Sequence, residues 1–174
     1  APPHATIGGL LAAGLSGPLR LGYGTPGDWL LGMRGVLDDG RLVMERQFRY
    51  PLGRVLLEFP AGKLDPGEPV QHCAQRELVE ETGYVAREWA RACAIHNACA
   101  YADEAIEIWF ARGLSLGARQ LDAGELIDVC VMSEPELDAL AARGELTDVK
   151  TLIGLQWLQK WRAGQWTLDW VAPA

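Results

Sequence analysis

Basic residues, paired cysteines and long apolar runs are all scarce in this chain of 174 residues. Lys and Arg number 16 against 23 Asp and Glu, which gives a formal net charge of −7. Proteins that bind the phosphate backbone usually carry a basic patch, so general nucleic-acid binding is disfavoured. No run approaches the roughly 20 apolar residues that a membrane-spanning helix needs. We therefore expect neither nucleic acid nor membrane as a partner.

The four cysteines form no Cys-x-x-Cys pair. Their even number permits disulfides, but a chain of this length can hold a core without them. The spacing of paired zinc ligands is missing as well. No basic stretch precedes the Gly/Ala/Leu-rich residues 5–17, so we do not predict a signal peptide. Reduced thiols in a cytoplasmic protein are the favoured interpretation.

The length indicates a single domain, and the amino-acid composition is typical of globular proteins. The Gly/Pro-rich residues 1–27 predict an arm or irregular segment, and residues 28–174 predict the folded domain. Strands are expected at 29–37, 41–50, 54–59, 89–97, 105–112 and 127–132, and helices at 70–82, from 133 to near 144, and at 147–163. Clustered strands with helices between and after them favour an α/β protein with helices on both sides of a mixed sheet.

Punctuating residues support several of these boundaries. The run Asp38-Asp39-Gly40 predicts a hairpin turn, and Ser133 with Glu136 has the spacing of a capping box. Residues 60–69 contain three Pro and two Gly and predict a loop. In the last helix, four apolar residues have the spacing of a core-facing stripe: Leu152, Leu155, Leu158 and Trp161.

Acidic residues concentrate between positions 58 and 81, where six acids stand against two bases. On a helix, Glu77, Glu80 and Glu81 fall within an arc of about 100°. Like charges at these spacings cost about 0.2–0.5 kcal/mol per pair, and the helix dipole disfavours them in the second half of the helix. A hard divalent cation explains the crowding if Arg76 pairs with Glu80 and leaves Glu77 and Glu81 for the metal. A solvated acidic helix face is the alternative.

The full spacing resembles the signature box of the Nudix hydrolases, with Tyr84 where the family usually has an aliphatic residue. The box occupies seven positions: Gly62, Glu68, Arg76, Glu77, Glu80, Glu81 and Gly83. Residues 45–50, 58–62 and 154–158 are similar to the ADP-ribose pyrophosphatase branch, so the resemblance covers about residues 28–162. It implies a Nudix-type α/β/α sandwich with a mixed sheet, which hydrolyses a nucleoside diphosphate linked to another group.

The resemblance also implies a metal site. By position, Glu77, Glu81 and the carbonyl of Ala61 would hold Mg²⁺, or Mn²⁺ in its place. Glu68 would be structural or a distal ligand. Bound cations of this kind offset the negative charge of a pyrophosphate, acidify the attacking water and align it with phosphorus.

Three further residues are implied in catalysis. Glu80 would be a supporting carboxylate with Arg76 as its orienting partner. A general base is also required, and the branch carries it on an acidic loop before the late strand. The position usually held by the base falls at Ala123, which cannot accept a proton. We favour Glu125, with Asp122 nearby, and an acidic loop without a role is the alternative.

The substrate site is expected near the one basic cluster, Arg46, Arg49 and Arg54. The forked guanidinium group suits phosphate oxygens, and we favour Arg49 for the substrate, with Arg54 and Glu58 beside it. Glu104 is a candidate for binding ribose or an amide, or else a surface charge at the end of a strand.

The resemblance makes conversion of ADP-ribose to AMP and ribose 5-phosphate the leading reaction. Residues 98–100 read Ala-Cys-Ala where the branch often has Ser-Pro-Gly, so a GDP-sugar such as GDP-mannose stays open as the substrate. A non-catalytic nucleotide-sensing module on the same fold is a further alternative, because of Ala123. Members of the branch are commonly homodimers in which the partner completes the site, and we expect a homodimer here.

Overall fold

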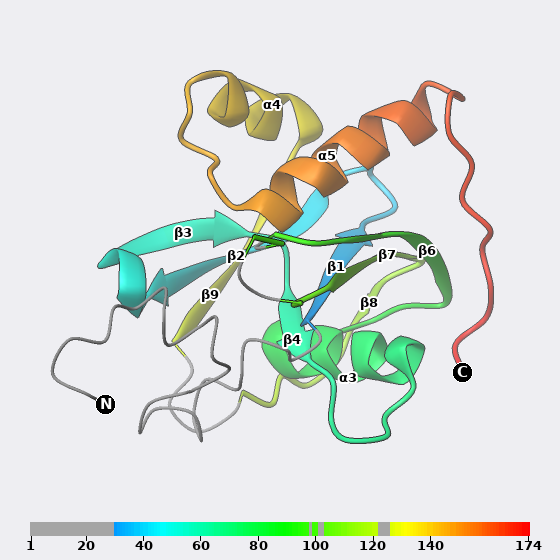
Figure 1. The fold of residues 1–174 in the computed structure, drawn as a ribbon. Coiled ribbons are helices and arrows are strands. Elements are labelled where there is room, and N and C mark those ends of the chain that lie inside the picture. The colour runs from blue at the N-terminus through cyan, green and yellow to red at the C-terminus, as the bar shows by residue number, and fades with distance from the viewer. Residues whose placement is uncertain (1–29, 98, 101–102, 122–125) are drawn as a thin grey trace, which may run out of the picture.

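The computed structural model describes residues 30–97, 99–100, 103–121 and 126–174. The predicted arm at residues 1–27 lies outside the described residues. The elements follow one another in this order (Figure 1): β1 Leu30–Val36, β2 Leu42–Arg49, η1 Tyr50–Leu52, β3 Arg54–Glu58, β4 Ala61–Lys63, α3 Val70–Thr82, β5 Tyr84–Val85, β6 Glu88–Ile95, β7 Ile106–Arg112, β8 Ser115–Leu116, β9 Ile127–Met132, α4 Glu134–Ala142 and α5 Val149–Arg162.

The main sheet has the strand order β3-β2-β1-β7-β6, with β4 also paired to β1 and β9 also paired to β2. Strands β1 and β7 run parallel, and the other pairs are antiparallel. The sheet is therefore mixed, as the sequence predicts. Strand β7 is buried along nearly its whole length, because both faces of the sheet are covered.

Each face of the sheet has its own apolar core. Ile108 and Phe110 of β7 belong to the cluster that α4 and α5 cover. Trp109 and Ala111 alternate with them and belong to the second cluster, which α3 covers. Figure 1 shows α4 and α5 on one side of the sheet and α3 on the other. This confirms the predicted α/β/α sandwich, since alternating side chains of one strand feed two cores.

Helix α3 has the bounds that the sequence predicts. Pro69 occupies its N-cap position, and Gly83 ends it with a positive φ of 77°, a conformation that glycine adopts at little cost. Cys73, Ala74 and Leu78 anchor the helix on its core. The same packing turns the acidic residues of α3 toward β4, which contacts α3 and pairs with the central strand β1.

The prediction of an unbroken loop at residues 60–69 is wrong in its first part. Residues Ala61–Lys63 form β4, which pairs antiparallel with β1 through Gly32↔Ala61 and its neighbours. Strands β5 and β8 were also not predicted. They pair with each other over two residues each. All three are too short to show an alternating pattern, and only their partner strands define them.

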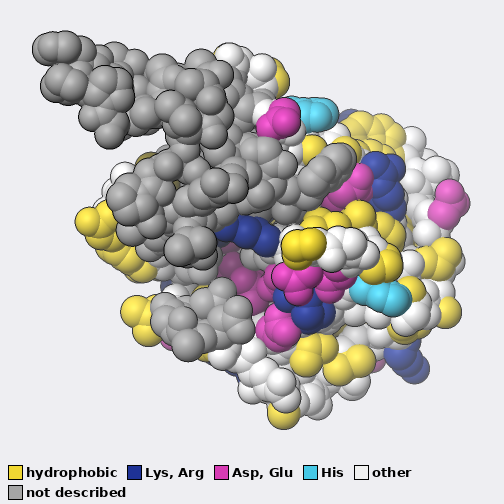
Figure 2. Space-filling view, turned by 60° about the horizontal axis from the view of Figure 1, so that its bottom comes forward, with side chains coloured by type: hydrophobic (Ala, Val, Ile, Leu, Met, Phe, Trp, Pro, Cys, Tyr) yellow, Lys and Arg dark blue, Asp and Glu magenta, His cyan; other side chains and the backbone are white. Residues whose placement is uncertain are grey.

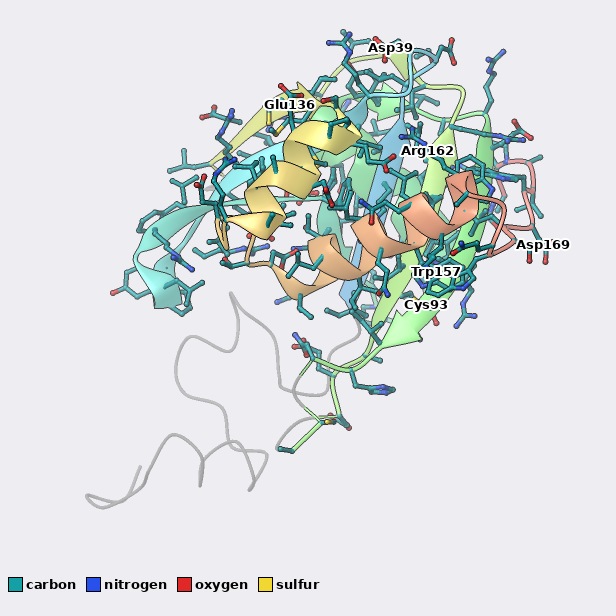
Figure 3. All side chains as sticks on the ribbon, turned by 90° about the horizontal axis from the view of Figure 1, so that it is seen from above. Asp39, Cys93, Glu136, Trp157, Arg162 and Asp169 are labelled. Carbon is teal, nitrogen blue, oxygen red and sulfur yellow. The ribbon has the colours of Figure 1, made fainter. Side chains whose placement is uncertain are left out.

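The predicted apolar stripe of the last helix is partly wrong. Leu155 and Leu158 are buried, but Leu152 is 37% exposed. Thr151 and Gly154 face the sheet instead, because the side chain of Arg34 fills the space above Gly154. Further along the helix, Trp157 lies beside Cys93 of β6 (Figure 3), and both pack on the apolar core.

The capping box at Ser133 and Glu136 is present and starts α4. Asp148 caps α5 by accepting a 2.9 Å hydrogen bond from the backbone N–H of Thr151. The four cysteines are free thiols. None of the helices in the described part of the chain combines the length and apolar character needed to cross a bilayer.

Candidate active site

Strand β4 and helix α3 are joined by two hydrogen bonds that involve the predicted metal ligands. The backbone N–H of Ala61 donates to Oε2 of Glu81 at 2.9 Å, and that of Lys63 donates to Oε1 of Glu77 at 3.1 Å. Ala61 and Lys63, two positions apart on β4, thus contact Glu81 and Glu77, four positions apart on α3. Both pairs of positions lie on one side of their own element, so the two carboxylates are held side by side along β4.

Gly62 lies between these two contacts and has no space for a side chain. A Cβ atom there would sit 1.8 Å from Cδ of Glu77. The first glycine of the box is therefore required by the close approach of a carboxylate to the backbone. Glu77 is partly buried, and burial raises its pKa even though Arg76 opposes that shift.

Arg76 organises the acidic residues around it. Its Nε and Nη2 atoms donate to the two oxygens of Glu68 at 3.0 and 2.9 Å, and Nη1 donates to Glu80 at 2.8 Å. The hydrogen bond from Arg76 lowers the pKa of Glu68 to about 2. Nη1 also donates to Glu77 at 3.0 Å. The pairing with Glu80 agrees with the sequence analysis, but Arg76 does not leave Glu77 free as expected there.

Glu45 of β2 has Glu81 among its neighbours, and the residue-by-residue predictions did not include it. Its side chain is 0% exposed, and neither carboxylate oxygen has a hydrogen-bond donor among the described residues. The carboxyl group of Glu81 is near enough to share a proton with it. Burial raises the pKa of Glu45 to about 7. Strand alternation could have indicated the position, since Glu45 shares a face with the buried Val43.

Beside Glu45, Glu58 forms a buried ion network. Arg49 donates to both of its oxygens, from Nε at 2.8 Å and from Nη2 at 2.6 Å, and Nζ of Lys150 donates to Oε2. Glu58 is 1% exposed. Burial alone would raise its pKa, but the hydrogen bonds of Arg49 and the charge of Lys150 lower it. The structure places Glu58 behind Arg49 as its partner, and sequence reasoning did not identify Lys150.

The basic cluster is divided between the two faces of the sheet. Arg49 and Arg54 are directly opposite each other on β2 and β3, so their side chains leave the same face. Arg46 leaves the other face, because it is three residues before Arg49 on the same strand. Arg54 is exposed and donates to Oγ1 of Thr147 at 3.3 Å. Two arginines of the three are thus brought together.

Glu104 is partly buried two residues before β7 begins, at the end of the sheet where Leu30 of β1 pairs with Ile106. The predicted base Glu125 and its neighbour Asp122 lie outside the described residues, as does Ala123. On the surface, acidic side chains gather beside basic ones in the middle of the face that carries α3 (Figure 2).

The donor set fits a hard divalent cation in part. No group of three His, Cys, Asp or Glu side chains in the described ranges converges as a ready metal site. Glu45, however, presents two buried oxygens that lack a hydrogen-bond donor among the described residues, and Glu81 is held beside the backbone of Ala61. Magnesium typically takes one or two protein carboxylates and completes its shell with water and substrate phosphates. The residues present therefore suit an ion that binds together with a diphosphate.

Comparison with known proteins gives concordant results. A family model described as NUDIX domain matches residues 32–152. The ADP-ribose pyrophosphatase of Bacillus subtilis (strain 168) is 38% identical over 126 residues, which cover 71% of this chain and 68% of that protein. The methanol dehydrogenase activator of Bacillus methanolicus is 35% identical over 126 residues, with the same coverage. A crystal structure of an ADP compounds hydrolase shares the fold, with a TM-score of 0.72, 23% identity, and coverage of 79% of this chain and 74% of that one.

Proposed function

Because the chain belongs to the Nudix family of hydrolases, we propose that it cleaves the pyrophosphate bond of a nucleoside diphosphate sugar. ADP-ribose, converted to AMP and ribose 5-phosphate, is the proposed substrate. The observation that carries the proposal is the docking of β4 on α3, which aligns Glu77 and Glu81 along the backbone of residues 61–63. The name of the Bacillus subtilis relative supports the choice of substrate.

The proposed cofactor is Mg²⁺, with Mn²⁺ as a substitute, held by Glu77, Glu81 and the carbonyl of Ala61. When bound, such an ion offsets the charge of the diphosphate and acidifies a water molecule. Around it, Arg76 keeps Glu80 and Glu68 in place through the hydrogen bonds described above. A carboxylate cluster of this density needs that guanidinium, because it would otherwise spread apart by mutual repulsion.

We assign the arginines to the diphosphate. Arg49 is 37% exposed at its side chain although Glu58 holds two of its nitrogens, so one edge of the guanidinium stays accessible. Arg54 stands opposite on β3. Glu58 then acts by orienting Arg49 and not by touching the substrate. Glu104 is proposed for the ribose side, and Glu125 as the general base.

We further propose a cytoplasmic homodimer. Four free thiols suit a reducing compartment, and the net charge of −7 does not favour nucleic acid as a partner. Large apolar side chains are exposed around the β2–β3 connection, where a second copy could cover them: Phe48, Tyr50, Leu52 and Val55. Light scattering on the purified chain tests the proposed dimer: a homodimer should give twice the mass of the single chain.

The function is tested with a panel of ADP-ribose and GDP-mannose incubated with Mg²⁺, read out as released nucleoside monophosphate. We expect AMP from ADP-ribose at the highest kcat/KM. Glu81→Gln should lower the rate by orders of magnitude, whereas Glu145→Gln, which removes an exposed carboxylate paired with Arg143, should not. Preference for GDP-mannose would reassign the substrate. Tight binding of ADP-ribose without turnover would instead indicate a nucleotide sensor.

A further inference from the structure

Glu45 has the surroundings of a ligand and lacks those of a structural acid. A buried carboxylate normally receives hydrogen bonds or an ion pair, because a bare buried charge is costly. Glu58, Glu81 and Glu107 all follow this rule in this protein, each with N–H donors on its oxygens. Glu45 is as fully buried as these three, yet neither of its oxygens meets a donor among the described residues.

The neighbours of Glu45 make its position still less favourable. Glu58 is its direct register partner on β3, and like charges at directly opposed positions repel. The basic groups nearby already have partners. Arg49 donates to both oxygens of Glu58, and Lys150 contacts Glu58 and Asp148. An apolar residue at position 45 would be expected from stability alone, since Val43 and Met44 beside it are buried.

Among the neighbours that influence the pKa of Glu45, Glu81 is the one on α3. The interaction with the carboxyl group of Glu81 lowers the pKa of Glu45 and so opposes the effect of its burial. Oε2 of Glu81 accepts from the N–H of Ala61, which holds this carboxylate beside β4. Two buried carboxylates, one on β2 and one on α3, supply hard oxygen ligands of the kind that divalent cations prefer.

We propose that Glu45 is a further carboxylate of the cation site and shares a divalent cation with Glu81. The proposal rests on the proposed function, which supplies the ion, and extends the ligand set from α3 and β4 to β2. The cation bound there would lie between the sheet and the helix, so its binding would tie β2 to α3. Loss of Glu45 should weaken the binding of metal even when no substrate is present.

The test measures Mn²⁺ binding to the full chain by electron paramagnetic resonance of the free ion, with and without AMP. Glu45→Gln keeps the shape of the side chain and removes its charge, and Glu45→Met replaces it with an unbranched apolar side chain of similar size. Glu134→Gln is the matched control, since it also removes one carboxylate but lies on α4, paired with Arg162. Loss of a residue that only supports a metal ligand typically weakens metal binding about 10–100-fold, so loss of Glu45 as a ligand should weaken it by at least that factor.

Thermal unfolding with and without Mn²⁺ gives a second measurement, which distinguishes a metal ligand from a residue that only stabilises the fold. Without metal, Glu45→Gln should unfold at the wild-type temperature or above, because a buried charge has gone. With Mn²⁺, its rise in Tm should be smaller than that of the wild type. The control should reproduce the wild-type rise.

Two results separate this proposal from the proposed function. If both Glu45 variants bind Mn²⁺ as the wild type does while Glu81→Gln does not, Glu45 is no part of the site and the proposed function stands. If the wild type binds no Mn²⁺ under either condition, both proposals are overturned. A lower Tm of the metal-free variants with unchanged Mn²⁺ affinity would make Glu45 a structural residue.

Discussion

The backbone N–H of Ala61 donates a 2.9 Å hydrogen bond to the carboxylate of Glu81, 20 residues later in the chain. This contact places a short strand against the acidic edge of a helix. Because β4 is at the same time paired with β1, the helix is tied to the middle of the sheet and not only to a loop. Changes in β4 are therefore expected to act on the site directly.

Gly62→Ala should abolish most activity. The new Cβ would lie 1.8 Å from Cδ of Glu77, so the carboxylate has to move away from the backbone of β4. We expect kcat to fall by orders of magnitude, with a stability loss of about 1–3 kcal/mol from overpacking, measured by steady-state kinetics and urea unfolding. Gly32→Ala is the control on the neighbouring strand, since its Cβ would meet ordinary contacts at 3.6 Å and beyond. Equal kcat for Gly62→Ala and Gly32→Ala would contradict the close approach of the Glu77 carboxylate to the backbone at Gly62.

Lys150→Met should destabilise the protein by about 3–5 kcal/mol, because removing one partner of a buried ion network leaves charge uncompensated. Lys150 is 6% exposed and contacts Glu58 and Asp148. Weaker orientation of Arg49 should also raise KM for the diphosphate. Lys160→Met on the same helix, where the ammonium group donates to Gln165, should change stability little. Denaturant unfolding and kinetics of the two variants provide the comparison.

Acid should weaken the fold through Glu68. Hydrogen bonds from Arg76 lower the pKa of this carboxyl group to about 2, below its ordinary value of about 4.5. The folded state therefore binds fewer protons here than the unfolded state, and the stabilisation is present above about pH 4.5 and is lost as the pH falls toward 2. Unfolding curves at several pH values in this window should show a steeper loss for the wild type than for Glu68→Gln. Parallel curves would contradict the assignment.

Removal of residues 171–174 should loosen the attachment of α3. The backbone of Val171 exchanges two hydrogen bonds with Trp89, and the carbonyl of Ala172 accepts one from the side chain of Gln71 on α3. At about 0.5–1.5 kcal/mol each, the loss of these three hydrogen bonds should lower stability by about 1.5–4.5 kcal/mol in urea unfolding. Gln71→Ala, which removes only the last of the three, should show a smaller effect. An unchanged midpoint in the shortened chain would contradict this role.

Local patterns sufficed for α3, for the capping box at Ser133 and for the pairing of Arg76 with Glu80, because each depends on residues within four positions of one another. The box positions could likewise be read from spacing alone. Strand β4, the role of Gly62 and the burial of Glu45 could not. Each depends on what the chain brings against these residues from far away, as Glu77 against Gly62 and Glu81 against Glu45.

The same reason explains Glu58 and Leu152. The sequence predicts Glu58 as a substrate contact but does not reveal that Lys150, 92 residues later, donates to it. Leu152 has helical core spacing but is exposed, because the side chain of Arg34 packs over Gly154 and places Thr151 and Gly154 against the sheet together with Leu155 and Leu158. Periodicity tells which residues of an element share a face. Which face is buried, and whether a buried charge has a partner, follows from packing between elements that no local pattern encodes.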